Sequence, residues 1–359
     1  MKKNLAILVA IFMVVGLLAA CNGGGTTTPP PAQGGAAQPP AQDAAAQPPA
    51  QGGAAQPPAQ GGAATEPPAS GDRILRAAFV TQAMSNESQA FSWREFQRLA
   101  PEHGFEMSVF AGENEPAVEF EGVMTAIAEG FDAVFVNPSD YNAILPAMRQ
   151  AHDAGLVVGF FSTIPEEEHH NFIHFFVGSD DFLGGVQAGE FVSQNFPGGA
   201  NFVEVGGQAG HSAAMARHLG FQEGIADNIV MLDSQFAPTG WNTHEALAIM
   251  EDFIVRFGDQ IDIVWCHWDN GASGVIDALQ AAGRDDVFVI GVDGNRTGYA
   301  QVRAGTQALS VGQSFTNMAD ESLRLARVII EGGTVQLENF IPLDMVTIET
   351  IDTFVEPDW

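Results

Sequence analysis

Apolar residues recur with two different periods along the chain from about residue 72 onward. Short runs rich in Val, Ile and Phe predict strands, and longer stretches with a helical apolar period predict amphipathic helices. Ten strands are expected, at 74–81, 105–110, 132–136, 156–161, 173–177, 201–206, 229–234, 261–265, 287–292 and 308–312. Eight helices are expected, at 88–103, 117–129, 140–154, 182–195, 212–226, 242–256, 272–282 and 316–331.

The alternation of strands and helices predicts an α/β fold. Parallel strands need crossover connections, and these place helices over both faces of the sheet. Ten strands are too many for a single sheet in a chain of this length, and the series divides near 178–181. We therefore expect two Rossmann-like, doubly wound lobes with a cleft between them.

The first residues of the chain have the pattern of an export signal. Two lysines precede an apolar run over residues 5–20, as in a secretory signal peptide, and the run is too short for a membrane span. The tetrapeptide Leu-Ala-Ala-Cys that ends at Cys21 resembles the bacterial lipobox, in which the Cys sulfur is acylated and the chain is cut before it. We expect residues 1–20 to be a lipoprotein signal peptide and Cys21 to carry the lipid. An ordinary signal peptide with an unmodified Cys21 is the alternative.

Residues 21–71 combine the expected lipidated Cys with a stretch of low complexity. The nine-residue unit AQGGAAQPP recurs from residue 32, and between residues 22 and 71 the only charged side chains are Asp43 and Glu66. Without aromatic residues this stretch has too little apolar surface to form a core. Gly-Gly pairs loosen the chain and Pro-Pro pairs stiffen it, so we expect a semi-flexible tether.

The charge balance is strongly acidic and excludes one class of function. The chain has 44 Asp and Glu against 14 Lys and Arg, for a formal net charge of −30. Nucleic-acid readers need clustered Lys and Arg, so no nucleic-acid partner is expected. Both lysines lie in the expected signal peptide, which leaves arginine alone to balance the acids. We hypothesise that this surface suits a salty or alkaline exterior.

Four segments occur in an order that resembles a known family. They are Val136-Asn137-Pro138-Ser139-Asp140, Gly178-Ser179-Asp180-Asp181, Ser212-Ala213-Ala214 with Arg217, and Gly291-Val292-Asp293-Gly294. Together they are similar to the type I periplasmic sugar-binding proteins, the ribose- and galactose-binding family of ABC importers, over about residues 72–345.

The resemblance implies two lobes that close on a ligand about a three-crossover hinge, the periplasmic binding protein type I architecture. We place the crossovers near 178–180, 312–315 and 340–344. The expected N-terminal lobe is 72–179 plus 314–341, and the expected C-terminal lobe is 180–313 plus 342–359.

A sugar site needs flat apolar surfaces together with charged or amide groups for the hydroxyls. Open α/β sheets place such groups after the carboxyl ends of their strands. Ten ligand-binding residues are expected on this basis and from the resemblance: Asn86, Phe91, Trp93, Asn137, His211, Arg217, Trp241, Trp268, Asp293 and Gln313.

The family's motifs suggest a role for most of these residues. The spacing of His211 and Arg217 is similar to that of the galactose- and glucose-binding branch, in which both side chains reach the sugar. Asn137, Asp293 and Gln313 match positions of the family's hydrogen-bonding ligand residues, although a turn role is open for the first two.

Aromatic residues are expected to cover the faces of the sugar. Trp241 matches a position where the family places a ring against the ligand, with capping of the helix as the alternative. Phe91 and Trp93 follow Asn86 in the first loop, and core packing of the first helix is their alternative role.

Two departures from the family's pattern affect the expected ligand. Phe161-Ser162-Thr163 stands where the family often has Asp-Arg, and Trp268 replaces a hydroxyl-binding amide. Both changes predict a less polar, more aromatic pocket. A deoxy- or methylated sugar, a pentose or a nucleoside would suit such a pocket better than a fully hydroxylated hexose.

Other chemistry is expected to be absent. Residues 166–174 contain three Glu and three His, but without the helical spacing of ligand pairs we expect a solvated loop and no metal. We expect no cofactor and no catalytic residues.

The sequence thus predicts a monomeric, non-enzymatic lipoprotein at the outer face of the cell membrane or in the periplasm. It would capture a sugar and deliver it to an ABC permease, with ligand contacts from both lobes favouring the closed state. Three alternatives stay open: presentation of the ligand to a chemoreceptor or sensor kinase, binding of a nucleoside or signalling furanose, and a carbohydrate-active surface enzyme.

Overall fold

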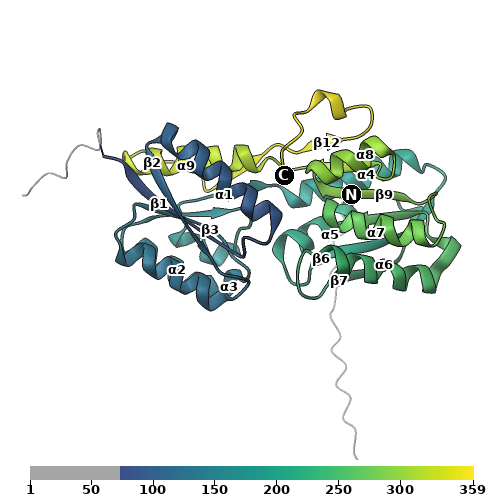
Figure 1. The fold of residues 1–359 in the computed structure, drawn as a ribbon, viewed down its shortest axis with the longest axis horizontal. Helices are drawn as coiled ribbons and strands as arrows, with labels where there is room; N and C mark the ends of the chain where they lie inside the picture. The colour runs from purple at the N-terminus through teal and green to yellow at the C-terminus, as the bar shows by residue number, and fades with distance from the viewer. Residues whose placement is uncertain (1–72) are drawn as a thin grey trace, which may run out of the picture. The chain divides into compact units, whose positions relative to one another are not determined.

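The computed structural model describes residues 73–359, which form two six-stranded sheets with helices on both faces of each (Figure 1). The strand order of the first sheet is β11-β5-β4-β3-β1-β2, and all its neighbours are parallel. The second sheet has the order β12-β10-β9-β8-β6-β7, and only β12 runs antiparallel to its neighbour. The expected fold class, two α/β lobes, is confirmed.

The first lobe is built from the first sheet and four helices. Its strands are β1 (Leu75–Thr81), β2 (Phe105–Ala111), β3 (Ala133–Asn137), β4 (Val157–Phe161), β5 (Phe175–Ser179) and β11 (Glu338–Ile341). Its helices are α1 (Glu87–Leu99), α2 (Pro116–Ala128), α3 (Tyr141–Asp153) and α9 (Phe315–Ile330).

The second lobe is built from the second sheet and five helices. Its strands are β6 (Ala200–Gln208), β7 (Ile229–Ala237), β8 (Ile263–Cys266), β9 (Phe288–Asp293), β10 (Leu309–Gly312) and β12 (Asp344–Val346). Its helices are α4 (Asp181–Asn195), α5 (Ser212–Gly224), α6 (Thr243–Phe257), α7 (Asp269–Ala281) and α8 (Arg296–Ala304).

The first sheet separates two apolar cores. Leu75 and Phe79 of β1 pack with α1 and α9, whereas Ala78 and Val80 of the same strand pack with α2 and α3. Successive side chains of a strand point to opposite faces, so a strand that is covered on both sides reads as a continuous apolar run. This is why β3 and β4 are buried at every position.

Two helices of the second lobe approach each other unusually closely. A Cβ at Gly220 of α5 would lie 2.0 Å from the carbonyl oxygen of Phe182, and one at Gly224 would lie 2.1 Å from that of Val186. Only glycine lets α4 and α5 pack with their backbones in contact. The pair covers the face of the second sheet that carries Phe202 and Trp265.

The sequence located ten of the twelve strands that residues 73–359 contain, and it missed the strands β11 and β12 and the helix α8. The strands β11 and β12 are short and only partly buried, and α8 buries only Gly298, Tyr299 and Val302, so their apolar patterns are weak. The expected helix 88–103 is in fact α1 followed by a 3₁₀ turn over Ala100–His103, which begins next to Pro101.

The chain passes between the sheets after β5, after β10 and between β11 and β12. Residue 359 also connects the lobes: the ring of Trp359 packs with Phe91 and Phe315 in a core of the first lobe, while its carbonyl oxygen accepts a hydrogen bond from the Arg296 N–H, 2.6 Å away, at the start of α8.

The expected signal peptide, Cys21 and the tether lie outside the described residues. Within residues 73–359, no helix has both the length and the apolar character needed to cross a membrane.

Candidate functional site

Four expected site residues lie together after the carboxyl ends of β6, β7 and β8. The rings of His211 and Trp241 meet edge to face with centroids 5.3 Å apart, and those of Trp241 and Trp268 do so at 5.7 Å. The guanidinium carbon of Arg217 lies 5.4 Å from the centroid of the Trp241 ring, within the range of a cation–π interaction. The second lobe therefore places one cation and two indole rings in a single cluster.

Glycine residues allow both indole rings to take these places. A Cβ at Gly207 in β6 would lie 2.1 Å from the ring of Trp241, and a Cβ at Gly271 in α7 would lie 2.3 Å from the ring of Trp268. Side chains at these positions would displace the rings. Trp241 stays half-buried, whereas Trp268 is 3% exposed and belongs to the core beneath α6 and α7.

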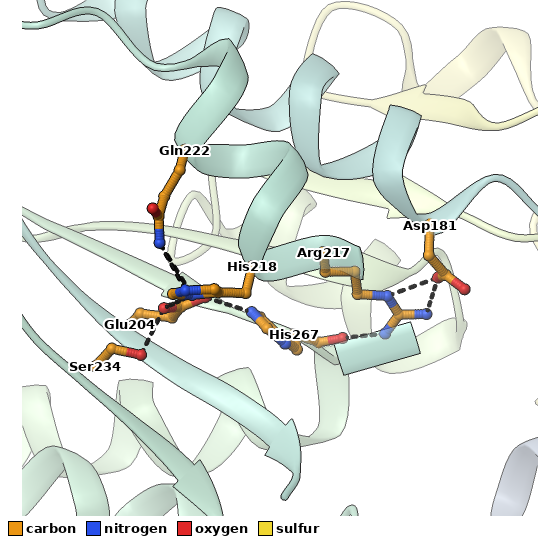
Figure 2. A network of polar contacts seen from close by, with 7 residues as sticks. All are labelled: Asp181, Glu204, Arg217, His218, Gln222, Ser234 and His267. Carbon is orange, nitrogen blue, oxygen red and sulfur yellow. Dashed lines mark hydrogen bonds and ion pairs between the residues drawn. The ribbon is translucent and has the colours of Figure 1, made fainter. Parts of the chain in front are cut away.

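Arg217 is held firmly from two sides (Figure 2). Its Nε and Nη2 both lie 2.8 Å from Oδ1 of Asp181, and its Nη1 donates to the carbonyl oxygen of His267 at 2.6 Å. Only 5% of Arg217 is exposed. A guanidinium has five N–H groups, so these contacts leave two of them without a partner among residues 73–359. Asp181 balances the charge of Arg217, which suits a neutral ligand.

His211 is neutral in this environment. It precedes the first residue of α5, and its Nδ1 accepts a hydrogen bond from the Ala213 N–H at 3.3 Å. Burial, with a smaller effect from the charge of Arg217, lowers the pKa of His211 to about 4. The neutral ring is the form that can serve as acceptor at the helix N-terminus.

Asp293 and Gln313 form a second pair, at the ends of β9 and β10. Gln313 Nε2 donates to Asp293 Oδ1 at 3.1 Å, and the Gln313 N–H donates to the Asp293 carbonyl oxygen at 2.8 Å. Asp293 has a φ of 125°, a strained conformation that is enriched at ligand sites. Burial and the neighbouring charge of Asp269 raise the pKa of Asp293 well above its usual range.

Asp269 fixes the turn that follows Asp293. Its Oδ2 accepts from the Gly294 N–H at 2.9 Å and from the Ser310 hydroxyl at 2.6 Å, and Gln307 Nε2 donates to Oδ1 at 2.7 Å. Burial raises the pKa of Asp269 to about 6. The strained residue is thus supported by a buried carboxylate on the neighbouring element.

The first lobe contributes polar groups from its own strand ends. Asn137 ends β3, is 2% exposed and accepts a hydrogen bond from the Thr163 hydroxyl at 3.5 Å. Asn86 is the N-cap of α1, and its side-chain oxygen accepts from the Ser88 N–H at 3.1 Å and from the Ser88 hydroxyl at 2.8 Å. Its hydrogen-bonding capacity is therefore partly used within its own helix.

Phe91 and Trp93 pack against one apolar core of the first lobe. Phe91 is 4% exposed, and its ring stacks on that of Trp359 with centroids 5.5 Å apart. Trp93 is half-buried against the same core. Both positions agree with core packing of the first helix, the alternative that the sequence left open. Contact of either ring with a ligand stays a prediction.

A cavity of about 310 Å³ adjoins the cluster at His211, the one expected site residue among those that line it. Loops from both lobes line it: residues 138–142 after β3, Thr163 after β4, and 208–212 between β6 and α5. Its volume lies at the lower end of the range for small-molecule sites. A second cavity, of about 380 Å³, lies where β3, β4 and β5 begin, away from all ten expected residues. We favour the first cavity because open α/β sheets bind ligands at the carboxyl ends of their strands.

Three residues around Arg217 were not expected from the sequence. Asp181, which was recognised only as part of a motif, and His267 contact Arg217 directly, whereas Glu204 contacts His267. A sequence signal existed for Glu204, because a charged residue inside the apolar run 201–206 needs buried partners.

Comparison with known proteins agrees with this geometry. A family model described as a periplasmic binding protein domain matches residues 77–334. The ribose import binding protein RbsB of Escherichia coli (strain K12) is 29% identical over 251 residues, which cover 70% of this chain and 83% of that protein. The galactofuranose-binding protein YtfQ of the same strain is 26% identical over 272 residues, which cover 72% and 85%.

Solved structures share the fold. A galactofuranose binding protein has a TM-score of 0.72 and 24% sequence identity, and the match covers 78% of this chain and 96% of that one. An ABC transporter solute binding protein from Bacillus halodurans C-125 with bound myo-inositol has a TM-score of 0.72 and 24% identity, with coverage of 79% and 98%. Because the family model spans well over half of the sequence, this chain belongs to the periplasmic binding protein domain family, and its resemblance to the type I sugar-binding members is confirmed.

Proposed function

We propose that this protein is the extracytoplasmic solute-binding component of an ABC importer and that it binds a single neutral sugar between its lobes. The observation that carries the proposal is the convergence of Arg217, Trp241 and His211, of which His211 lines a cavity that both lobes enclose. The relatives support it, because their names and structures describe ribose, galactofuranose and myo-inositol as ligands.

Each group of the site has a role that fits a polyol. Trp241 presents an apolar ring to a C–H face of the sugar, and the two remaining N–H groups of Arg217 donate to hydroxyl oxygens. Asp293 accepts from hydroxyl groups, with its orientation fixed by Gln313. Asn137 adds an amide from the first lobe. Because a ligand held in this way contacts both lobes, it stabilises the closed state over the open one.

The side chains around the cavity favour a ligand with few hydroxyl groups or a small ring. Thr163 lines the cavity where related proteins often carry a charged pair, and its hydroxyl already contacts Asn137. Trp268 places a buried indole behind Trp241, where an amide is common. A pentose, a furanose or a deoxysugar leaves fewer hydroxyl groups unpaired in such a site than a hexopyranose does.

Further features of the anchor, the tether and the partners belong to the proposal. The Leu-Ala-Ala-Cys tetrapeptide supports a lipid anchor at Cys21, and the repeat after it supports a tether that lets the binding unit move above the membrane. The permease of the importer is the expected partner, and the binding protein acts as a monomer without a cofactor.

Titration calorimetry and Trp fluorescence of the chain without its signal peptide test the proposal. The panel includes D-ribose, L-arabinose, D-fucose, D-allose and myo-inositol. We expect saturable one-to-one binding of at least one compound, with a change in indole emission. Absence of binding across the panel, or chemical conversion of the bound compound, would contradict the proposal.

A further inference from the structure

A carboxylate lies inside the second lobe at a place where an apolar residue would be usual. Glu204 is in the middle of β6, is 1% exposed, and has buried Val203 and Val205 on either side. Its Oε1 lies 2.8 Å from His267 Nε2, and its Oε2 lies 2.6 Å from both His218 Nδ1 and the Ser234 hydroxyl (Figure 2). A buried carboxylate is costly unless it is well hydrogen-bonded, so three donors at one carboxylate indicate a built arrangement.

The protonation states of this group follow from its surroundings. Burial lowers the pKa of His267, which is fully buried, so its ring is neutral and its Nε2 carries the proton donated to Glu204. Burial acts to raise the pKa of Glu204, but the hydrogen bonds from His267 and Ser234 outweigh it and lower that pKa. Glu204 is therefore an ionised acceptor at neutral pH.

Two short routes lead from Glu204 to Arg217. In the first, Glu204 holds the imidazole of His267, whose carbonyl oxygen accepts from Arg217 Nη1 at 2.6 Å. In the second, Glu204 holds His218, the residue that follows Arg217 in α5. Figure 2 shows both routes, with Asp181 closing the other side of the guanidinium. Fixing both His267 and His218 leaves Arg217 little freedom to turn.

We propose that Glu204 is a positioning residue of the ligand site, which holds Arg217 through His267 and His218 so that its free N–H groups stay directed at the ligand. This inference rests on the proposed function only for the identity of the ligand, because the ordering of Arg217 is a property of the ligand-free chain. The charged and titratable groups that face this network are Asp181 from α4, Arg217 and His218 from α5, and His267 after β8.

The first test examines Arg217 without a ligand. In protein labelled with ¹⁵N-arginine, the twelve Arg Nε–H signals are recorded, and that of Arg217 is identified by its loss in Arg217→Lys. We expect a separate, slowly exchanging signal in the parent chain and a shifted or broadened, faster-exchanging one in Glu204→Gln. Glu119→Gln is the matched control, since Glu119 is also fully buried but lies in the first lobe, where it accepts from the Ser139 N–H. It should leave the Arg217 signal unchanged.

The second test measures affinity for whichever panel sugar binds the parent chain. Glu204→Gln should weaken binding about tenfold, the effect of disordering one or two charge-assisted hydrogen bonds. In the Arg217→Lys background the same change should cost less than about twofold, because the group it positions is gone. Thermal unfolding of each variant checks that the fold is retained.

The outcomes separate the inference from the proposed function. If no sugar binds the parent chain, the proposed function fails, and the Arg Nε–H spectrum still decides the positioning role. If Glu204→Gln leaves the Arg217 signal unchanged, the inference is wrong. Equal losses of affinity in the parent and Arg217→Lys backgrounds would also overturn it, because a merely structural role of Glu204 acts independently of Arg217. If Arg217→Lys does not bind the sugar measurably, the Arg217 Nε–H signal alone decides whether Glu204 has the positioning role.

Discussion

The two lobes support their expected site residues very differently. In the second lobe, Arg217 is held by Asp181 and by the carbonyl oxygen of His267, and Trp241 lies against a glycine of β6. In the first lobe, within residues 73–359, the Asn137 side chain has one hydrogen bond, from the Thr163 hydroxyl, and the Asn86 side chain is held only by Ser88 of its own helix. We infer that the second lobe presents a preorganised surface that binds the sugar first, and that the first lobe then closes over it. Preorganisation reduces the entropy lost on binding, so most affinity should reside in the second lobe.

Removing Arg217 should have the largest effect. Arg217→Met leaves the carboxylate of Asp181 buried without its partner, so the free energy of unfolding should fall by about 3 kcal/mol and sugar binding should be lost. Urea unfolding and calorimetry measure the two effects. In the first lobe, Arg324→Met removes an exposed i,i+3 pair with Glu321 and should cost less than about 1 kcal/mol. If the free energy of unfolding falls equally in the two variants, the proposed difference in support between the lobes is wrong.

The contributions of aromatic rings to sugar affinity should also differ between the two lobes. Trp241→Ala should weaken sugar binding by about 2 kcal/mol, or about 30-fold, because a ring at the centre of the site is lost. Trp93→Ala should have a much smaller effect on affinity, since Trp93 packs against a core of the first lobe. A comparable loss in both variants, measured by calorimetry, would place a first-lobe ring against the sugar.

Adding a single methyl group at Gly207 in the second lobe should weaken sugar binding only in part. The Cβ of Gly207→Ala would lie 2.1 Å from Trp241 and must displace that ring. Affinity should fall about tenfold, because the indole is moved without being removed. Gly198→Ala is the control in the same lobe, since a Cβ there meets nothing within 4 Å. If indole emission and affinity of Gly207→Ala match those of the parent, the position of Trp241 is not constrained as described.

Acid should weaken the fold through His211. The pKa of His211 is lowered to about 4 in the folded protein, against an ordinary value near 6.5 in the unfolded chain. The unfolded state therefore binds more protons in this window, and stability is lost as the pH falls from about 6.5 to about 4.

Because the ring is half-buried, His211→Asn should recover only about 1 kcal/mol of this loss. Unfolding free energies at several pH values compare the variant with the parent chain. His174→Asn makes the same comparison of unfolding free energy against pH in the first lobe, since burial also lowers the pKa of His174. Identical pH profiles for His211→Asn and the parent would contradict the account.

The fold was predictable because strands buried on both faces leave an unmistakable apolar pattern. β3 and β4 were located almost to the residue, whereas β11, β12 and α8 were missed because they bury few side chains. Edge strands of this kind are selected by tertiary pairing, which no local pattern records.

The clustering of the second-lobe candidates was predictable mainly from their match to the family's motifs. Arg217, Trp241 and Trp268 were expected near the ligand, and the structure brings them together with His211. The network of Glu204, His218 and His267 joins segments 63 positions or fewer apart in the sequence, and its meeting point depends on how α5 packs on the second sheet. Helix packing of this kind depends on the tertiary structure. Its only signal in the sequence is a charged residue within an apolar strand.

The most direct test of the account is calorimetric titration of the chain without residues 1–20 against the sugar panel, carried out in parallel for the parent and Trp241→Ala. The account predicts one-to-one binding of at least one neutral sugar by the parent chain, and binding about 30-fold weaker by the variant. Failure of every sugar to bind the parent, or equal affinity in the two proteins, would contradict it.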